Sequence, residues 1–174
     1  GHGDGTFATP FLVASAHGSS LVVGDFTEDG ALDFATRTET GIAISINNGM
    51  GGFLAPMTVT SIGFIGHLAS GDFNGDHHTD LIGLESAFVG GQNIYRAEVF
   101  PGNGDGSFGQ ATTWIYPNFV QNLAIADLDG DGSDDVLITD NGSSYVYGPG
   151  GVSIYFMGNG TPVDGAGFRA GLGT

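Results

Sequence analysis

The sequence has no cysteine and no lysine, and its 174 residues include only three arginines. Without cysteine, no disulfide is present to indicate a redox compartment. With so few basic residues, the chain lacks the positive patch that binds nucleic acid or an anionic membrane surface. No apolar run approaches the ~20 residues of a membrane-spanning helix. Apolar residues do not recur with a helical period over any stretch of about ten residues, so little helix is expected.

The chain is instead rich in glycine and in acidic residues. It has 33 glycines, which predict many turns, and 19 aspartates and glutamates, which give a formal charge of −16 at pH 7. Twelve of the 19 acidic residues lie in three short stretches. Such clustering favours cation sites over a generally charged surface, because close carboxylates repel one another and require solvent or a cation. The length allows one domain with a hydrophobic core.

Three nine-residue stretches share one pattern of carboxylates. We call residues 25–33 loop 1, residues 72–80 loop 2 and residues 127–135 loop 3. Loop 3 carries aspartates at positions 1, 3, 5 and 9, so its side-chain oxygens converge if the backbone curls. Ca2+ takes about 6–8 oxygen ligands from loops of this kind. An EF-hand is excluded because position 12 holds Thr36, Gly83 or Ile138 instead of glutamate. Three Asp-Gly hairpin turns without metal remain the alternative.

A glycine-rich turn that ends in phenylalanine alternates with these loops. It ends at Phe7, Phe53 and Phe108, with a looser copy at Phe168. The step from each of the first three to the next loop is 18, 19 and 19 residues. The intervening segments are rich in β-branched and aromatic residues and are bounded by turn residues, which is typical of strands. Among them, residues 7–15 are expected to form a strand. Four short antiparallel strands in each repeat predict a β-propeller.

The Asp-x-[Asp/Asn]-x-Asp-Gly-x-x-Asp loop, followed at a distance by Gly-Asn-Gly-Asp-Gly-x-Phe, resembles the FG-GAP/VCBS repeat. The resemblance extends over nearly the whole chain. It implies an all-β fold of four-stranded antiparallel propeller blades, with three Asp-loop repeats and a ring that is incomplete within one chain. The expected segments are residues 1–15 as the outer strand of a preceding blade, 16–61 as blade 1, 62–117 as blade 2 and 118–174 as blade 3.

In this family, the side chains at loop positions 1, 3, 5 and 9 and the backbone carbonyl at position 7 hold Ca2+. The resemblance therefore implies three structural Ca2+ sites, each supplied by a single loop. The implied ligands are Asp25, Thr27, Asp29, Ala31 and Asp33 in loop 1, Asp72, Asn74, Asp76, His78 and Asp80 in loop 2, and Asp127, Asp129, Asp131, Ser133 and Asp135 in loop 3. Loop 2 has His77 where glycine is usual, so its turn must tolerate a side chain.

The loops between the second and third strands are expected on the face opposite the Asp loops. Residues 85–94 and 140–151 lengthen that face, and loops on a rigid scaffold often bind ligands. Tyr116, Tyr145 and Tyr147 are candidates to stack on sugar rings or to anchor a protein partner. The alternative for each is an exposed or core-packing aromatic side chain. The chain has no cysteine nucleophile and no Gly-x-Ser-x-Gly motif, so we do not expect an enzyme.

The sequence thus predicts a calcium-stabilised extracellular or cell-surface β-propeller module that binds a carbohydrate or protein ligand in adhesion. No nucleic-acid partner and no membrane span are expected. Two alternatives are a self-assembling subunit of an extracellular filament or oligomer, joined through open blade edges, and a non-catalytic domain of a secreted polysaccharide-acting enzyme. The incomplete ring is expected either because the chain is a fragment of a longer protein or because other chains complete it.

Overall fold

The computed structural model describes residues 2–10, 12–13, 20–61, 63–116, 119–140, 151–163 and 168–170. These residues form strands, turns and bends and no helix, which confirms the prediction of an all-β fold. It follows that the described part of the chain offers no helix with the length and apolar character needed to cross a membrane.

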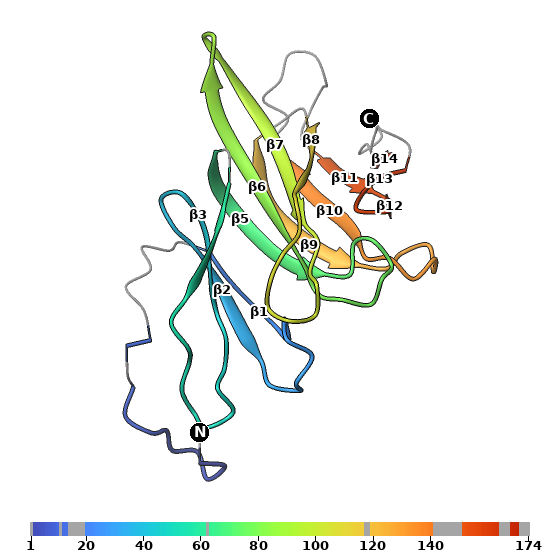
Figure 1. The fold of residues 1–174 in the computed structure, drawn as a ribbon. Helices are drawn as coiled ribbons and strands as arrows, with labels where there is room; N and C mark the ends of the chain where they lie inside the picture. Colours follow the sequence, from blue (N-terminus) through green and yellow to red (C-terminus); the bar gives the residue numbers. More distant parts are fainter. Residues whose placement is uncertain are drawn as a thin grey trace.

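The described residues build three four-stranded antiparallel sheets and one two-stranded pair (Figure 1). Sheet 1 contains β1 (Leu21–Gly24), β2 (Asp33–Arg37), β3 (Gly41–Ser45) and β4 (Met57–Thr60). Sheet 2 contains β5 (Phe64–Gly71), β6 (Asp80–Val89), β7 (Gln92–Phe100) and β8 (Thr112–Tyr116). Sheet 3 contains β9 (Val120–Ala126), β10 (Asp135–Asp140), β11 (Gly151–Tyr155) and β14 (Phe168–Ala170). The two-stranded pair consists of β12 (Met157–Gly158) and β13 (Thr161–Pro162).

Each four-stranded sheet is a meander, and the Asp loop of each repeat joins its first strand to its second. Sheet 2 lies between the other two, and its first strand contacts the first strands of both, β1 and β9. Successive residues of β6 point to opposite faces. Leu81 joins a buried cluster that contains Ile44 of sheet 1, whereas Ile82 joins a cluster that contains Val136 of sheet 3. Because both faces of sheet 2 are covered, β6 begins with a continuous apolar run instead of an alternating pattern.

The second and third strands of sheet 2 form a longer hairpin than the sequence pattern predicts (Figure 1). Residues 85–94, expected as a loop insertion, continue β6 and β7 up to a two-residue turn. Gly90 and Gly91 have φ values of +60° and +86°, which suit the type I′ turn of a two-residue hairpin. The loop prediction was wrong because these glycines are a hairpin signal, and the residues on either side pair in register.

The strand expected over residues 7–15 does not form in the described part of that range, which comprises residues 7–10, 12 and 13. Phe7 and Leu12 are 82% and 86% exposed. A strand requires a hydrogen-bonded neighbour, and none of the sheets in the described residues includes this segment.

Candidate metal centre and ligand cavity

The aspartate at position 9 is buried in each Asp loop, and its carboxylate accepts hydrogen bonds from two backbone N–H groups. In loop 1, the carboxylate of Asp33 accepts hydrogen bonds from the N–H groups of Phe26, at 3.0 Å, and Asn47, at 2.7 Å. The equivalent donors are Phe73 and Gly102 for Asp80 in loop 2, and Leu128 and Met157 for Asp135 in loop 3. In each case the first donor lies in the loop and the second follows the third strand. Each of these carboxylates therefore ties its loop to its sheet.

The aspartate at position 1 closes the loop around its own carboxylate. In loop 2, Asp72 accepts hydrogen bonds from the N–H groups of Gly75, at 2.7 Å, and His77, at 2.8 Å. Asp25 and Asp127 accept equivalent bonds within loops 1 and 3. The residues at position 5 each accept a bond from the N–H group two residues further on. Since these N–H groups turn inward, the side-chain oxygens gather on the inner side of the curl.

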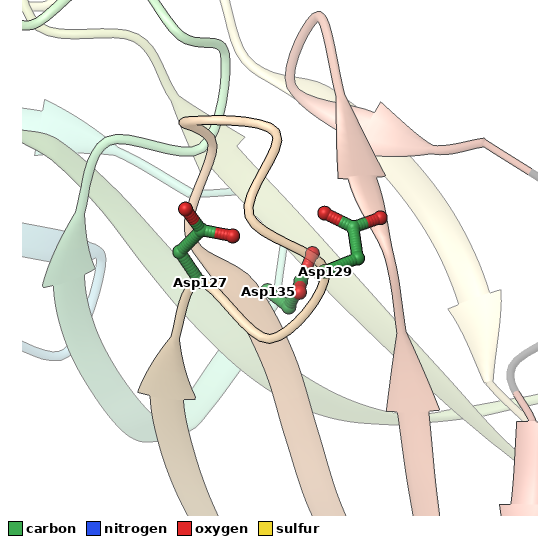
Figure 2. Close-up of side chains that lie close together, drawn as sticks. All are labelled: Asp127, Asp129 and Asp135. Carbon is green, nitrogen blue, oxygen red and sulfur yellow. The ribbon is translucent and has the colours of Figure 1, made fainter.

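In loop 3 this curl brings three carboxylates together. Asp127, Asp129 and Asp135 each have a carboxylate oxygen within 4.8 Å of the others (Figure 2). Asp127 and Asp129 are exposed, whereas Asp135 is fully buried at the start of β10. None of the salt bridges found in the described residues involves these three side chains. Backbone N–H groups donate to all three carboxylates, but no cationic side chain of the described residues pairs with them. An all-oxygen, anionic donor set of this kind suits a hard divalent cation.

Loops 1 and 2 do not bring three carboxylates this close in the described residues. Their position 3 holds Thr27 or Asn74, so an uncharged oxygen stands where loop 3 has Asp129. Thr27 nevertheless fits a cation ligand, because its Oγ1 atom is buried and has no hydrogen-bond partner in the described part of the chain. The assignment of the Ala31, His78 and Ser133 carbonyls as ligands stays a prediction.

The electrostatics of loop 2 also favour a cation. Burial, with smaller contributions from the carboxylates of Asp76 and Asp72, raises the pKa of Asp80 to about 6 despite its two backbone N–H donors. A nearby cation would stabilise the charged form of such a carboxylate. The turn tolerates His77 as expected, with a φ of +70° and a side chain that is 89% exposed. His78 forms an ion pair with Glu28 of loop 1, and this hydrogen bond raises the His78 pKa.

The opposite end of sheet 2 contains a partly open cavity of about 240 Å3. Its wall includes three aromatic rings, in which Tyr95 stacks on Tyr116 and meets Phe119 edge to face. His67 and Ser86 contribute polar groups. The cavity residues belong to the ends of the strands away from loops 2 and 3. The sequence pattern does not point to Tyr95, Phe119 or His67, since only the folded sheet brings them together. The remaining lining residues are Gly66, Leu84, Glu85, Tyr116 and Val120.

Tyr116 is the one predicted ligand-binding tyrosine that the structure describes. It is only 4% exposed, and its hydroxyl donates a hydrogen bond to the backbone carbonyl of Glu85 at 3.0 Å. It therefore packs in the core and lines the cavity, and it is not an exposed platform for a ligand. Tyr145 and Tyr147 lie outside the described residues, as does most of the predicted insertion at 140–151.

Comparison with known proteins identifies one family. The FG-GAP-like repeat matches residues 25–83, which include loops 1 and 2. No curated protein matches the chain in sequence. A solved structure of an Agrocybe aegerita lectin, described as recognising non-reducing terminal N-acetylglucosamine, matches with 18% identity and a TM-score of 0.30. The match covers 87% of this chain, which spans only 57% of the length of the lectin chain. The chain thus carries an FG-GAP-like repeat, the family that its Asp loops predict.

Proposed function

We propose that this chain is a calcium-stabilised, non-catalytic binding module in which the three sheets are blades of a β-propeller. The FG-GAP-like repeat over residues 25–83 supports the assignment of loops 1 and 2. Asp135 repeats the hydrogen bonds of Asp33 and Asp80, which supports loop 3 as a third copy. An extracellular or cell-surface location is part of the proposal, because weak calcium modules load where calcium is about 10⁻⁴–10⁻³ M.

The proposed ligand is a carbohydrate, and its site is the aromatic cavity of sheet 2. The observation that carries this assignment is the grouping of Tyr95 and Phe119 around one cavity, with the buried Tyr116 stacked on Tyr95. Aromatic faces pack against the apolar C–H face of a sugar ring, and His67 and Ser86 offer hydrogen bonds to its hydroxyl groups. The volume of about 240 Å3 lies below the ~300–1,000 Å3 of pockets for drug-sized ligands. One terminal sugar residue therefore fits better than a long chain.

A glycan array followed by calorimetric titration tests the ligand site. Phe119→Ala should weaken the binding of the best glycan about tenfold or more, because this half-exposed ring forms one wall of the cavity. Phe88→Ala is the matched control, since Phe88 is 74% exposed near the tip of the long hairpin and lies outside the cavity. An array without any binding, or equal affinity of Phe119→Ala and the unmodified chain, would refute the carbohydrate assignment.

Thermal unfolding with and without a calcium chelator tests the cation. A site filled at 100 times its Kd stabilises the fold by about 2.7 kcal/mol. For a chain of this length, ~1 kcal/mol corresponds to about 2–4 °C in Tm. Chelation should therefore lower the Tm by roughly 5 °C or more for each occupied loop. A melting curve that is unchanged by the chelator would contradict the calcium proposal.

Self-association is a second candidate, favoured by the outward face of sheet 3. Val136 and Ile138 point into the core, so Leu137 between them faces outward. There it lines a groove of about 260 Å3 with Ala124, its partner on β9, and with Val152. Analytical ultracentrifugation would separate the two candidates: self-association predicts a mass that rises with concentration and falls back in Leu137→Glu. A constant monomer mass would exclude it.

A further inference from the structure

Two reciprocal hydrogen bonds join loop 2 to loop 3. The N–H group of Asp134 donates to the carbonyl of Asp72 at 2.6 Å, and the N–H group of Asp72 donates to the Asp134 carboxylate at 3.0 Å. Asp72 is the first residue of loop 2. Asp134 stands at position 8 of loop 3, between Ser133 and Asp135. The backbone of loop 2 is therefore bonded to Asp134, which lies between two implied cation ligands of loop 3.

The neighbouring residues leave room for this pair of bonds. A Cβ atom on Gly71, just before loop 2, would lie 2.6 Å from the Asp134 carboxylate, so glycine permits the close approach. Ser133 also lies close to loop 2, because its hydroxyl would be 3.2 Å from a Cβ atom placed on Gly75. Ser133 is buried, although it belongs to an exposed loop. Loops 2 and 3 thus share a packed contact, and Asp134 supplies its hydrogen bonds.

The junction between loops 1 and 2 has the same geometry and different chemistry. Thr79 occupies position 8 of loop 2, and its Cγ2 atom lies near Gly24, the residue before loop 1. Among the hydrogen bonds of the described residues, none joins Thr79 to Asp25. His78 and Glu28 form the polar contact at that junction through exposed side chains. The junction between loops 1 and 2, with Thr79 in the place of Asp134, therefore serves as an internal control for the effect of Asp134.

We propose that Asp134 couples cation binding at loops 2 and 3, so that filling either loop raises the affinity of the other. This inference rests on the proposed calcium sites. A cation held by loop 3, with the Ser133 carbonyl among its implied ligands, restrains the adjacent Asp134. Asp134 in turn holds the backbone of Asp72, so loop 2 loses less conformational entropy when it binds a cation. Coupling between two binding sites is reciprocal.

Calcium titrations of the full chain, followed by ¹⁵N NMR, measure the loops separately. The amides of Gly30, Gly75 and Gly130 each donate to the position-1 aspartate of their own loop and therefore report on loops 1, 2 and 3. Disabling loop 3 with Asp127→Asn and Asp129→Asn should weaken calcium binding at loop 2 about fivefold or more, the lower end of typical couplings. Binding at loop 1 should be unchanged.

The same comparison is then made in an Asp134→Thr background, which copies Thr79. Disabling loop 3 should now leave the affinity of loop 2 unchanged, and a Thr79→Ala control should keep the full fivefold effect. Asp134→Asn, which keeps the size and one acceptor oxygen, provides a milder variant if the threonine variant folds poorly, and the coupling should be smaller in it. If disabling loop 3 has an equal effect on loop 2 in the unmodified, Asp134→Thr and Asp134→Asn backgrounds, the coupling is overturned. Absence of calcium binding in the unmodified chain would instead overturn the proposed function.

Discussion

The carboxylate of Asp80 is fully buried, and each of its oxygens accepts a backbone N–H group, from Phe73 at 3.0 Å and from Gly102 at 2.7 Å. Substitution with alanine would leave both donors without this partner. An unsatisfied buried donor costs about 1–3 kcal/mol. Asp80→Ala should therefore lower the free energy of unfolding by about 2–6 kcal/mol. Asp80→Asn keeps one acceptor oxygen and should lose about half as much.

These magnitudes are large relative to the ~5–15 kcal/mol of a typical domain. They correspond to a fall in Tm of roughly 4–24 °C for Asp80→Ala. Unfolding should be followed by circular dichroism in a chelating buffer, so that the loss of a cation ligand does not contribute. Asp76→Ala is the matched control. Asp76 lies in the same loop and is exposed, so its carboxylate is replaced by solvent as an acceptor.

The expected order of stability in the chelator is the unmodified chain and Asp76→Ala together, then Asp80→Asn, then Asp80→Ala. If Asp80→Ala is no less stable than Asp76→Ala, the carboxylate of Asp80 does not tie loop 2 to its sheet. The same order should hold for substitutions at Asp33 and Asp135, because each accepts the equivalent pair of backbone donors.

Two further substitutions test the packing of sheets 1 and 2. Arg96→Met should lower the free energy of unfolding in urea by about 3 kcal/mol, because it leaves the buried carboxylate of Glu85 without its ion-pair partner at 3.1 Å. Adding Glu85→Gln should relieve this loss, and a double variant no more stable than Arg96→Met would contradict the explanation. Gly41→Ala should cost about 1–3 kcal/mol, since its Cβ would lie 2.0 Å from the carbonyl oxygen of Val59. Gly66→Ala, whose Cβ would meet only an atom at 3.6 Å, should cost less, and equal losses would refute the steric explanation.

The local features of the fold are predictable from sequence because their signals are local. Carboxylates that repel one another and glycines in a nine-residue stretch predict a loop. A strand follows where the apolar residues resume, as at Val136, one residue after the start of β10. The turn at Gly90 and Gly91 carries the same kind of local signal, although it lies within the predicted insertion. The burial of Tyr116 has no local signal, because it depends on Tyr95 and on the carbonyl of Glu85 in other strands.

The role of the position-9 aspartates shows where such prediction stops. The loop pattern marks Asp33 as a cation ligand, and its second backbone donor, Asn47, lies 14 residues further along the chain, beyond β3. Only the pairing of β2 with β3 brings that donor to the carboxylate. The same is true of Asp80 and Gly102, which are 22 residues apart. A nine-residue pattern therefore predicts a metal site and contains no information about this tie.

The two roles of each loop are separated by burial. The exposed aspartates at positions 1 and 3 of loop 3 converge where a cation can reach them, whereas Asp135 beneath them binds the backbone of the sheet. Removal of a cation should consequently loosen the exposed half of a loop and leave its tie to the sheet intact. In sheet 2, β5 and β6 run from loop 2 to the aromatic cavity, so an intact tie at Asp80 keeps both strands paired along their length. Chelation should then have a larger effect on the Tm than on the affinity for the ligand. Loss of the Asp80 carboxylate should lower both the Tm and the affinity.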